Sequence, residues 1–358
     1  MPSGQDLTIA ALLVQANDVC YKRELMNSMG REYNIEVPGI PPELQSTAKE
    51  DIGRLLDVIT IVADKQGARF LLDRVRVTDR FEDDVNRLLN DRSGLTGYGA
   101  ARRNAHAIAK TLWTRSEQGE IVFEVIIDAS QIGPWALSNA RCLTTVLHEL
   151  VHVLREGRHL ERLGEKEYTA DGDTRERWVD RWARLVLDEF DVDRLVNDIV
   201  GGLAKKDDGQ PWSLRELDEA QGLDWVHGLL DTLNRLPRFV DEEVCRYRTQ
   251  QIGIDDLAMT VIPYVKDLLV LLSHTAARYM GTDHWPDVVE QMRDTEASQR
   301  FMREHLDTIL THLDDAQPPL EESLQALGQA VEGIFRNCGL EFRTNPQSVY
   351  ISVSEPSV

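Results

Sequence analysis

The chain has 358 residues, 42% of them hydrophobic, and its 61 acidic and 40 basic side chains give a net charge of −21. This length accommodates two domains or one elaborated core, and the hydrophobic fraction is that of a globular protein. The negative charge disfavours nucleic acid as a partner, and no apolar run is long enough to predict a membrane span.

The N-terminal sequence and the cysteines indicate the compartment. The first residues lack the basic segment and the cleavage site of a signal peptide. The four cysteines, Cys20, Cys142, Cys245 and Cys338, are scattered without a CxxC pair. We therefore expect a cytoplasmic protein with reduced thiols and without a cysteine-based structural zinc.

Residues 1–66 are predicted to form an N-terminal helical region. A helical apolar pattern covers residues 6–29. A second helix is expected after Pro41 and Pro42, with residues 47–50 forming a capping box ahead of apolar positions at residues 52–62.

Alternating and apolar segments that follow predict a small sheet. Residues 70–78 form a first strand, and residues 107–114 and 121–127 form a hairpin; residues 85–90 form a short helix. The strand of residues 121–127 is the candidate edge strand, which could hold an extended segment of another chain by backbone pairing. An ordinary core strand is the alternative.

His148, Glu149 and His152 form a His-Glu-x-x-His motif, which favours zinc chemistry if it is helical. Residues four apart project from one helix face, so His148 and His152 could share one metal ion. Glu149 points to a neighbouring strip, within reach of a metal-bound water, where a general base must stand.

The motif lies in an apolar context. Apart from the motif itself, residues 143–154 carry no charged side chain, which is typical of a buried helix because an unpaired buried charge is costly. The helix is predicted to end near Arg155, Glu156 and Gly157.

A catalytic zinc needs a third protein ligand and an open position for water. The metzincin spacing requires a histidine and a glycine where this chain has Arg158 and Arg155. An acid from a later helix is the better candidate. We predict Glu176, in the first turn of a helix capped by Asp173 or Thr174.

Asp180 follows Glu176 by one helical turn and lies on the same face. It could orient a ligand imidazole by accepting its free N–H. The alternative is that both acids are solvated and pair with neighbouring arginines. The upstream motif favours the metal role.

Two segments resemble ImmA/IrrE-type metallopeptidases, a minimal gluzincin group. Residues 126–130 with 141–152 resemble the family's core, and residues 176–183 are similar to its Glu-x-x-Ala-x-x-Phe-Ala helix, with Val179 and Trp182 at the Ala and Phe positions. The similarity extends over residues 74–187. It implies a zincin-like core, one catalytic Zn²⁺ with Glu176 as the third ligand, and a specific regulatory protein as substrate.

The remaining sequence is predicted to be mainly helical. Gly201 to Pro211 includes the clearest linker, and a hairpin is expected at residues 340–344 and 348–353. The predicted fold class is α+β and predominantly helical, with a small twisted sheet and an active-site helix. The domain ranges are 1–66 for the helical region, 67–200 for the metallopeptidase core and 213–358 for an acidic helical domain.

Tyr168 and the later histidines are the remaining polar residues considered for a role at the site. Tyr168, between the two predicted metal helices, is the first candidate for an oxyanion-stabilising donor. Five later histidines are spaced irregularly and are expected to have packing or surface roles: His227, His274, His284, His305 and His312.

The function that these patterns predict is zinc-dependent cleavage of a peptide bond in a protein substrate, with Glu149 as catalytic base. The alternative is a non-catalytic zinc-binding regulatory or scaffold protein with a helical interaction domain. A protein or peptide is the expected partner, and no oligomeric state is favoured.

Overall fold

The computed structural model describes residues 33–93, 107–132, 135, 140–169, 175–203, 206, 209–314, 320–345 and 348–353. At several margins it describes the backbone alone: residues 91–93, 140–141, 175–178, 320, 344–345 and 348–350. The predicted helix of residues 6–29 and the predicted caps Asp173 and Thr174 lie outside the described residues.

The described chain forms two compact units. The first contains the residues up to Thr169 and residues 195–223, and the second contains residues 175–194 and 224–353. These boundaries differ from the predicted ranges. Helix α3 (Gln45–Lys65) belongs to the same unit as the sheet, and the long helix α8 (Arg175–Leu203) is shared between the units. Most described residues are helical, as predicted.

The first unit contains a four-stranded mixed sheet in the order β1-β2-β4-β3. Strands β1 (Ile35–Glu36), β2 (Leu72–Thr78) and β4 (Ile121–Asp128) run parallel, and β3 (Ala109–Arg115) is antiparallel to β4. The predicted strand and hairpin are therefore confirmed.

The predicted edge strand is wrong. Strand β4 lies between β2 and β3 and is buried at nearly every position, which explains its continuous apolar sequence. The outer strands are β1 and β3, and β3, the neighbour of β4, is less buried and carries polar residues such as Lys110 and Thr111.

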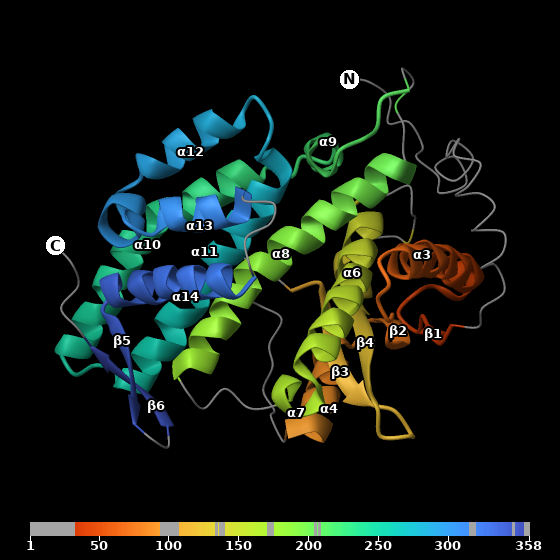
Figure 1. Ribbon diagram of the computed structural model, residues 1–358, viewed down its shortest axis with the longest axis horizontal. Coiled ribbons are helices and arrows are strands. Elements are labelled where there is room, and N and C mark those ends of the chain that lie inside the picture. The colour runs from red at the N-terminus through yellow and green to blue at the C-terminus, as the bar shows by residue number, and fades with distance from the viewer. Residues whose placement is uncertain are drawn as a thin grey trace. The chain divides into compact units, whose positions relative to one another are not determined.

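Helices α3 and α6 (Ala140–Leu163) pack against each other, and α6 also contacts β3 and β4 (Figure 1). Helix α4 (Phe81–Ser93), longer than predicted, packs Phe81, Val85 and Leu88 against Leu112 and Ile126 of the sheet. Helix α3 begins at Gln45 after a 3-10 turn at Pro42–Leu44, so the predicted capping box at residues 47–50 is wrong. The prolines set this start, because proline fits the first helical turn.

The end of α6 also differs from the prediction. The helix continues through Gly157 to Leu163 and stops at Gly164, whose φ of 75° ends it. Gly157 is instead a point of close packing, because a Cβ there would lie 2.7 Å from the carbonyl oxygen of Arg69. A glycine is required at this position because the backbone of Arg69 leaves no room for a side chain, so Gly157 does not mark the helix end.

The first unit also contains three short helices among the described residues. They are α5 (Ala129–Ile132), α7 (Glu165–Tyr168) and α9 (Leu214–Ala220). Ser213 and Glu216 form a capping box at the start of α9.

The second unit is a helical bundle with a terminal hairpin, as predicted. It contains the first part of α8 and five further helices: α10 (Trp225–Arg248), α11 (Ile254–Tyr279), α12 (Trp285–Arg293), α13 (Leu306–Asp314) and α14 (Leu320–Asn337). A π-helical turn at Ser298–Met302 separates α12 from α13. Strands β5 (Leu340–Asn345) and β6 (Ser348–Val353) pair antiparallel after α14 (Figure 1).

Among the described residues, α11 is long and apolar enough to cross a membrane by length and composition alone. The sequence did not predict this. More than half of its most apolar stretch is buried within the protein, and core residues such as Val265, Leu268 and Leu272 belong to it. A core helix of a globular bundle has these same properties.

The close approach at Gly157 gives a stability prediction. We expect Gly157→Ala to destabilise the protein by about 1–3 kcal/mol, because the backbone of Arg69 must move to admit the methyl group. Gly53→Ala is the matched control, since Gly53 is also helical but has open space around it. The control should stabilise the helix by roughly 0.5–1 kcal/mol. Urea unfolding of both variants measures this, and equal effects would contradict the packing role.

Candidate metal centre

The histidines of the motif converge on α6. The Nε2 atoms of His148 and His152 are 3.0 Å apart, and the two rings stand nearly perpendicular, at 78°. Both side chains are half-buried. Residues between and around them, such as Val146, Leu150 and Val153, are fully buried, so the apolar context predicted for this helix is confirmed.

This geometry suits a zinc ion. Two nitrogens bound at ~2.0–2.1 Å to a tetrahedral zinc are roughly 3.3 Å apart. The observed separation of the Nε2 atoms is close to that value, and only a small rotation of either ring is needed. His148 and His152 belong to a group of histidine and acidic side chains that could hold a metal ion, and Glu156 and His159 belong to a second such group.

A residue of the outer strand β3 holds the carboxylate of Glu149. The hydroxyl of Thr111, on β3, donates to Oε2 of Glu149 at 2.7 Å and lies 3.1 Å from its main-chain oxygen. Glu149 is buried, with 9% of its surface exposed. A charge-assisted hydrogen bond at this distance fixes the carboxylate orientation. The sequence analysis missed Thr111, because its proximity to the motif arises only from the packing of α6 on β3.

Tyr168, on α7, contacts an acid of α6. Its hydroxyl donates to Oε2 of Glu156 at 2.6 Å, and its ring packs edge-on against Phe123 of β4, with centroids 6.3 Å apart. Glu156 lies one helical turn beyond His152. The contact therefore ties α7 to α6, and it engages the hydroxyl that was predicted to stabilise an oxyanion.

Glu176 is the second residue of α8, and its side chain lies outside the described residues. Asp180 is half-buried on the same helix. Helix α8 carries the same Glu-x-x-x-Asp spacing a second time, at Glu189 and Asp193. The sequence analysis overlooked this second pair, although its spacing was visible in the chain.

The two pairs are far apart on α8. Glu189 follows Glu176 by 13 residues (189 minus 176), a rise of about 20 Å and a rotation that leaves them roughly 140° apart around the helix axis. One metal ion can therefore take its carboxylate from one pair only.

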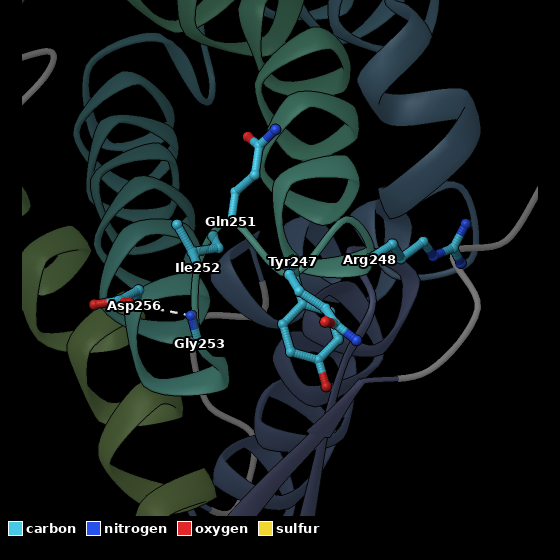
Figure 2. Close-up of a pocket in the computed structure, with 7 residues that line it drawn as sticks. Tyr247, Arg248, Gln251, Ile252, Gly253 and Asp256 are labelled. Atoms are coloured by element: carbon cyan, nitrogen blue, oxygen red, sulfur yellow. Dashed lines mark hydrogen bonds between the residues drawn. The ribbon is translucent and has the colours of Figure 1, made fainter.

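A pocket of about 530 Å³ lies elsewhere, at the turn between α10 and α11. Its lining residues are Tyr247, Arg248, Gln250, Gln251, Ile252, Gly253 and Asp256. Figure 2 shows Asp256 turned back to the backbone nitrogen of Gly253, a hydrogen bond of 3.1 Å at the start of α11. This pocket contains no residue of the predicted site, and its acid serves the helix start.

Comparison of the chain with protein-family models, with curated proteins and with solved structures gave no match. The resemblance to ImmA/IrrE-type metallopeptidases therefore rests on the two segments quoted above.

Proposed function

We propose that the chain is a zinc metallopeptidase of the gluzincin type, similar to ImmA/IrrE enzymes, that cleaves a peptide bond in a protein substrate. The observation that carries the proposal is the local arrangement on α6 and β3. Two imidazole nitrogens converge at a separation suited to zinc, and the glutamate between them is buried and oriented by Thr111. A structural zinc site would not require this glutamate.

The third ligand is proposed to be Glu176, the acid to which the resemblance to the family assigns this role. It lies in the first turn of α8, one turn before Asp180. Glu189, the acid that begins the second pair with this spacing, is the competing candidate on the same helix.

Three ligands would leave the fourth zinc position to water, as hydrolysis requires. A bound zinc ion would lower the pKa of that water and polarise the scissile carbonyl. Glu149 removes a proton from the attacking water through the carboxylate that Thr111 orients. The water oxygen would bond to the scissile carbonyl carbon, the carbon–nitrogen bond would then break, and Glu149 would deliver the same proton to the departing amine nitrogen.

The substrate is proposed to bind as an extended strand along β3. This strand is at the border of the sheet, and its Thr111 contacts the catalytic glutamate. An extended peptide that pairs with β3 would therefore lie next to Glu149. By resemblance to the family, the substrate is a specific regulatory protein in the cytoplasm.

The ligand assignment is tested by zinc affinity. We expect one zinc per chain and a loss of more than about 100-fold in affinity for Glu176→Gln, because a neutral amide is a poor zinc ligand. Glu189→Gln is the matched control on the same helix and should bind zinc normally. Chelator competition measures both. The reverse result would make Glu189 the ligand, and zinc binding that survives His148→Ala and His152→Ala would reject the site.

The catalytic role is tested by Glu149→Gln. Zinc content should be unchanged, whereas cleavage should fall by at least ~100-fold, because the amide cannot accept a proton. New protein N-termini are compared between cells that express the intact protein and cells that express the variant. Stoichiometric zinc without new N-termini in either culture would favour a non-catalytic zinc protein.

Thr111 should affect turnover through Glu149. Loss of a hydrogen bond to a charged group costs roughly 1.5–3 kcal/mol, so we expect Thr111→Val to lower kcat about 10–100-fold with zinc content unchanged. Thr111→Ser keeps the hydroxyl and should retain most of the activity. The rates are measured on the substrate that the comparison of N-termini identifies. A valine variant as fast as the serine variant would contradict the positioning role.

A further inference from the structure

A tryptophan on the outer strand β3 lies close to the residue that holds Glu149. The hydroxyl of Thr111 contacts Glu149 of α6, so the Thr111 side chain is on the α6 face of the sheet. Side chains alternate between the two faces of a strand, so Trp113 is on the same face, about 6.8 Å further along. Leu112, between them, packs with α4 on the opposite face. Trp113 is only half-buried, so part of its indole is open to a bound molecule.

Trp113 belongs to an aromatic cluster within the first unit. It is directly opposite Phe123 of β4 in the antiparallel register. Side chains of directly opposed residues touch across the strands, so Phe123 lies beside the indole on the inner side. Phe123 is 1% exposed, and its ring packs edge-on against Tyr168 of α7. The aromatic cluster is therefore Trp113, Phe123 and Tyr168, with Trp113 on the outer strand of the sheet.

The short helix α7 is fixed beside this cluster by two polar contacts. The Tyr168 hydroxyl donates to Glu156 of α6 at 2.6 Å. Glu165, at the other end of α7, pairs with Arg115, the last residue of β3, at 2.7 Å. Contacts to both α6 and β3 hold the aromatic surface in one arrangement, and a preformed surface binds with a smaller entropy cost than a flexible one.

The aromatic cluster lies close to the second histidine of the motif. Glu149 contacts Thr111, and Glu156, seven residues later on α6 (156 minus 149), contacts the aromatic cluster. His152 lies between these two acids along the helix. It is therefore level with the part of β3 between Thr111 and the cluster. A peptide on β3 that presents its scissile bond to Glu149 would present a neighbouring side chain to the indole.

We propose that the aromatic cluster selects a large apolar side chain of the substrate, such as leucine, methionine or phenylalanine. The inference rests on the function proposed above. A peptide that pairs with β3 also alternates its side chains, so the residue beside Trp113 is two positions from the residue beside Thr111. A large apolar side chain there removes the indole surface from water, whereas a small polar one leaves it exposed. Trp113 is thus a specificity-determining residue for a substrate position close to the cleaved bond.

The test is a double-mutant cycle between Trp113 and the substrate. The substrate is the protein that the comparison of N-termini identifies, and each of its residues near the cleaved bond is replaced by serine in turn. With the parent enzyme, serine at one large apolar position should lower kcat/KM about 10–100-fold. With full-length Trp113→Ala, the same replacement should change kcat/KM less than about threefold, because the contact that it removes is already lost.

Three further variants complete the cycle. Trp212→Ala is the matched control, because Trp212 is a half-buried tryptophan of the same unit whose ring lies 5.6 Å from Nζ of Lys206. It should respond to the serine replacement as the parent does. Trp113→Phe keeps an aromatic surface and should retain part of the response. Trp113→Val, which suits a strand, replaces the alanine variant if thermal unfolding shows that variant to be unfolded.

The outcomes separate the selectivity from the activity. Cleavage that no large apolar substrate residue affects would overturn the inference alone. A response equally large in the parent and in a folded Trp113 variant would do the same. Absence of any cleavage that depends on Glu149 would instead overturn the proposed function, and the inference with it.

Discussion

The placement of α6 against the sheet is the constraint on which the candidate centre depends. The helix buries a continuous apolar stripe, with Val146, Leu150 and Val153 fully buried, so rotation about its axis would expose core residues. His148 and His152 therefore face one direction because the core packing holds them there. Their convergence costs little further ordering, since the helix is already fixed by residues that do no chemistry.

The same packing joins the proposed base to the proposed substrate strand. Thr111 belongs to β3, and its hydroxyl reaches Glu149 because α6 contacts this strand. Strand β3 would therefore position both the bound peptide and the carboxylate of Glu149 that acts on it. In this arrangement, strand pairing and proton transfer depend on the same element, which favours an extended segment of substrate over a folded surface.

Local sequence patterns predicted much of the fold and part of the site. The hairpin of β3 and β4, the buried motif helix and the terminal hairpin all follow from periodicity over short windows. The end of α6 did not, because Gly157 serves a contact with Arg69 that is distant in sequence.

His274 shows why the spacing of single residues along the sequence does not predict their contacts in the fold. Five irregularly placed histidines gave no reason to prefer one, and packing roles were the reasonable expectation for all of them. In the structure, the imidazole of His274 lies between the carboxylates of Glu189 and Asp193. Such an assembly depends on contacts across 81 residues, and helical periodicity carries no information at that range.

The cost of the buried array of Asp193, His274 and Arg278, in which His274 and Arg278 both contact Asp193, argues for a role beyond stability. Apolar residues of similar size could fill the space of Asp193, His274 and Arg278, and replacing a buried ionic network by such residues is often neutral or stabilising. Here the imidazole of His274 also lies 3.7 Å from Glu189, so two acids of α8 share one partner on α11. The array therefore fixes the orientation of α8 against α11 within the second unit.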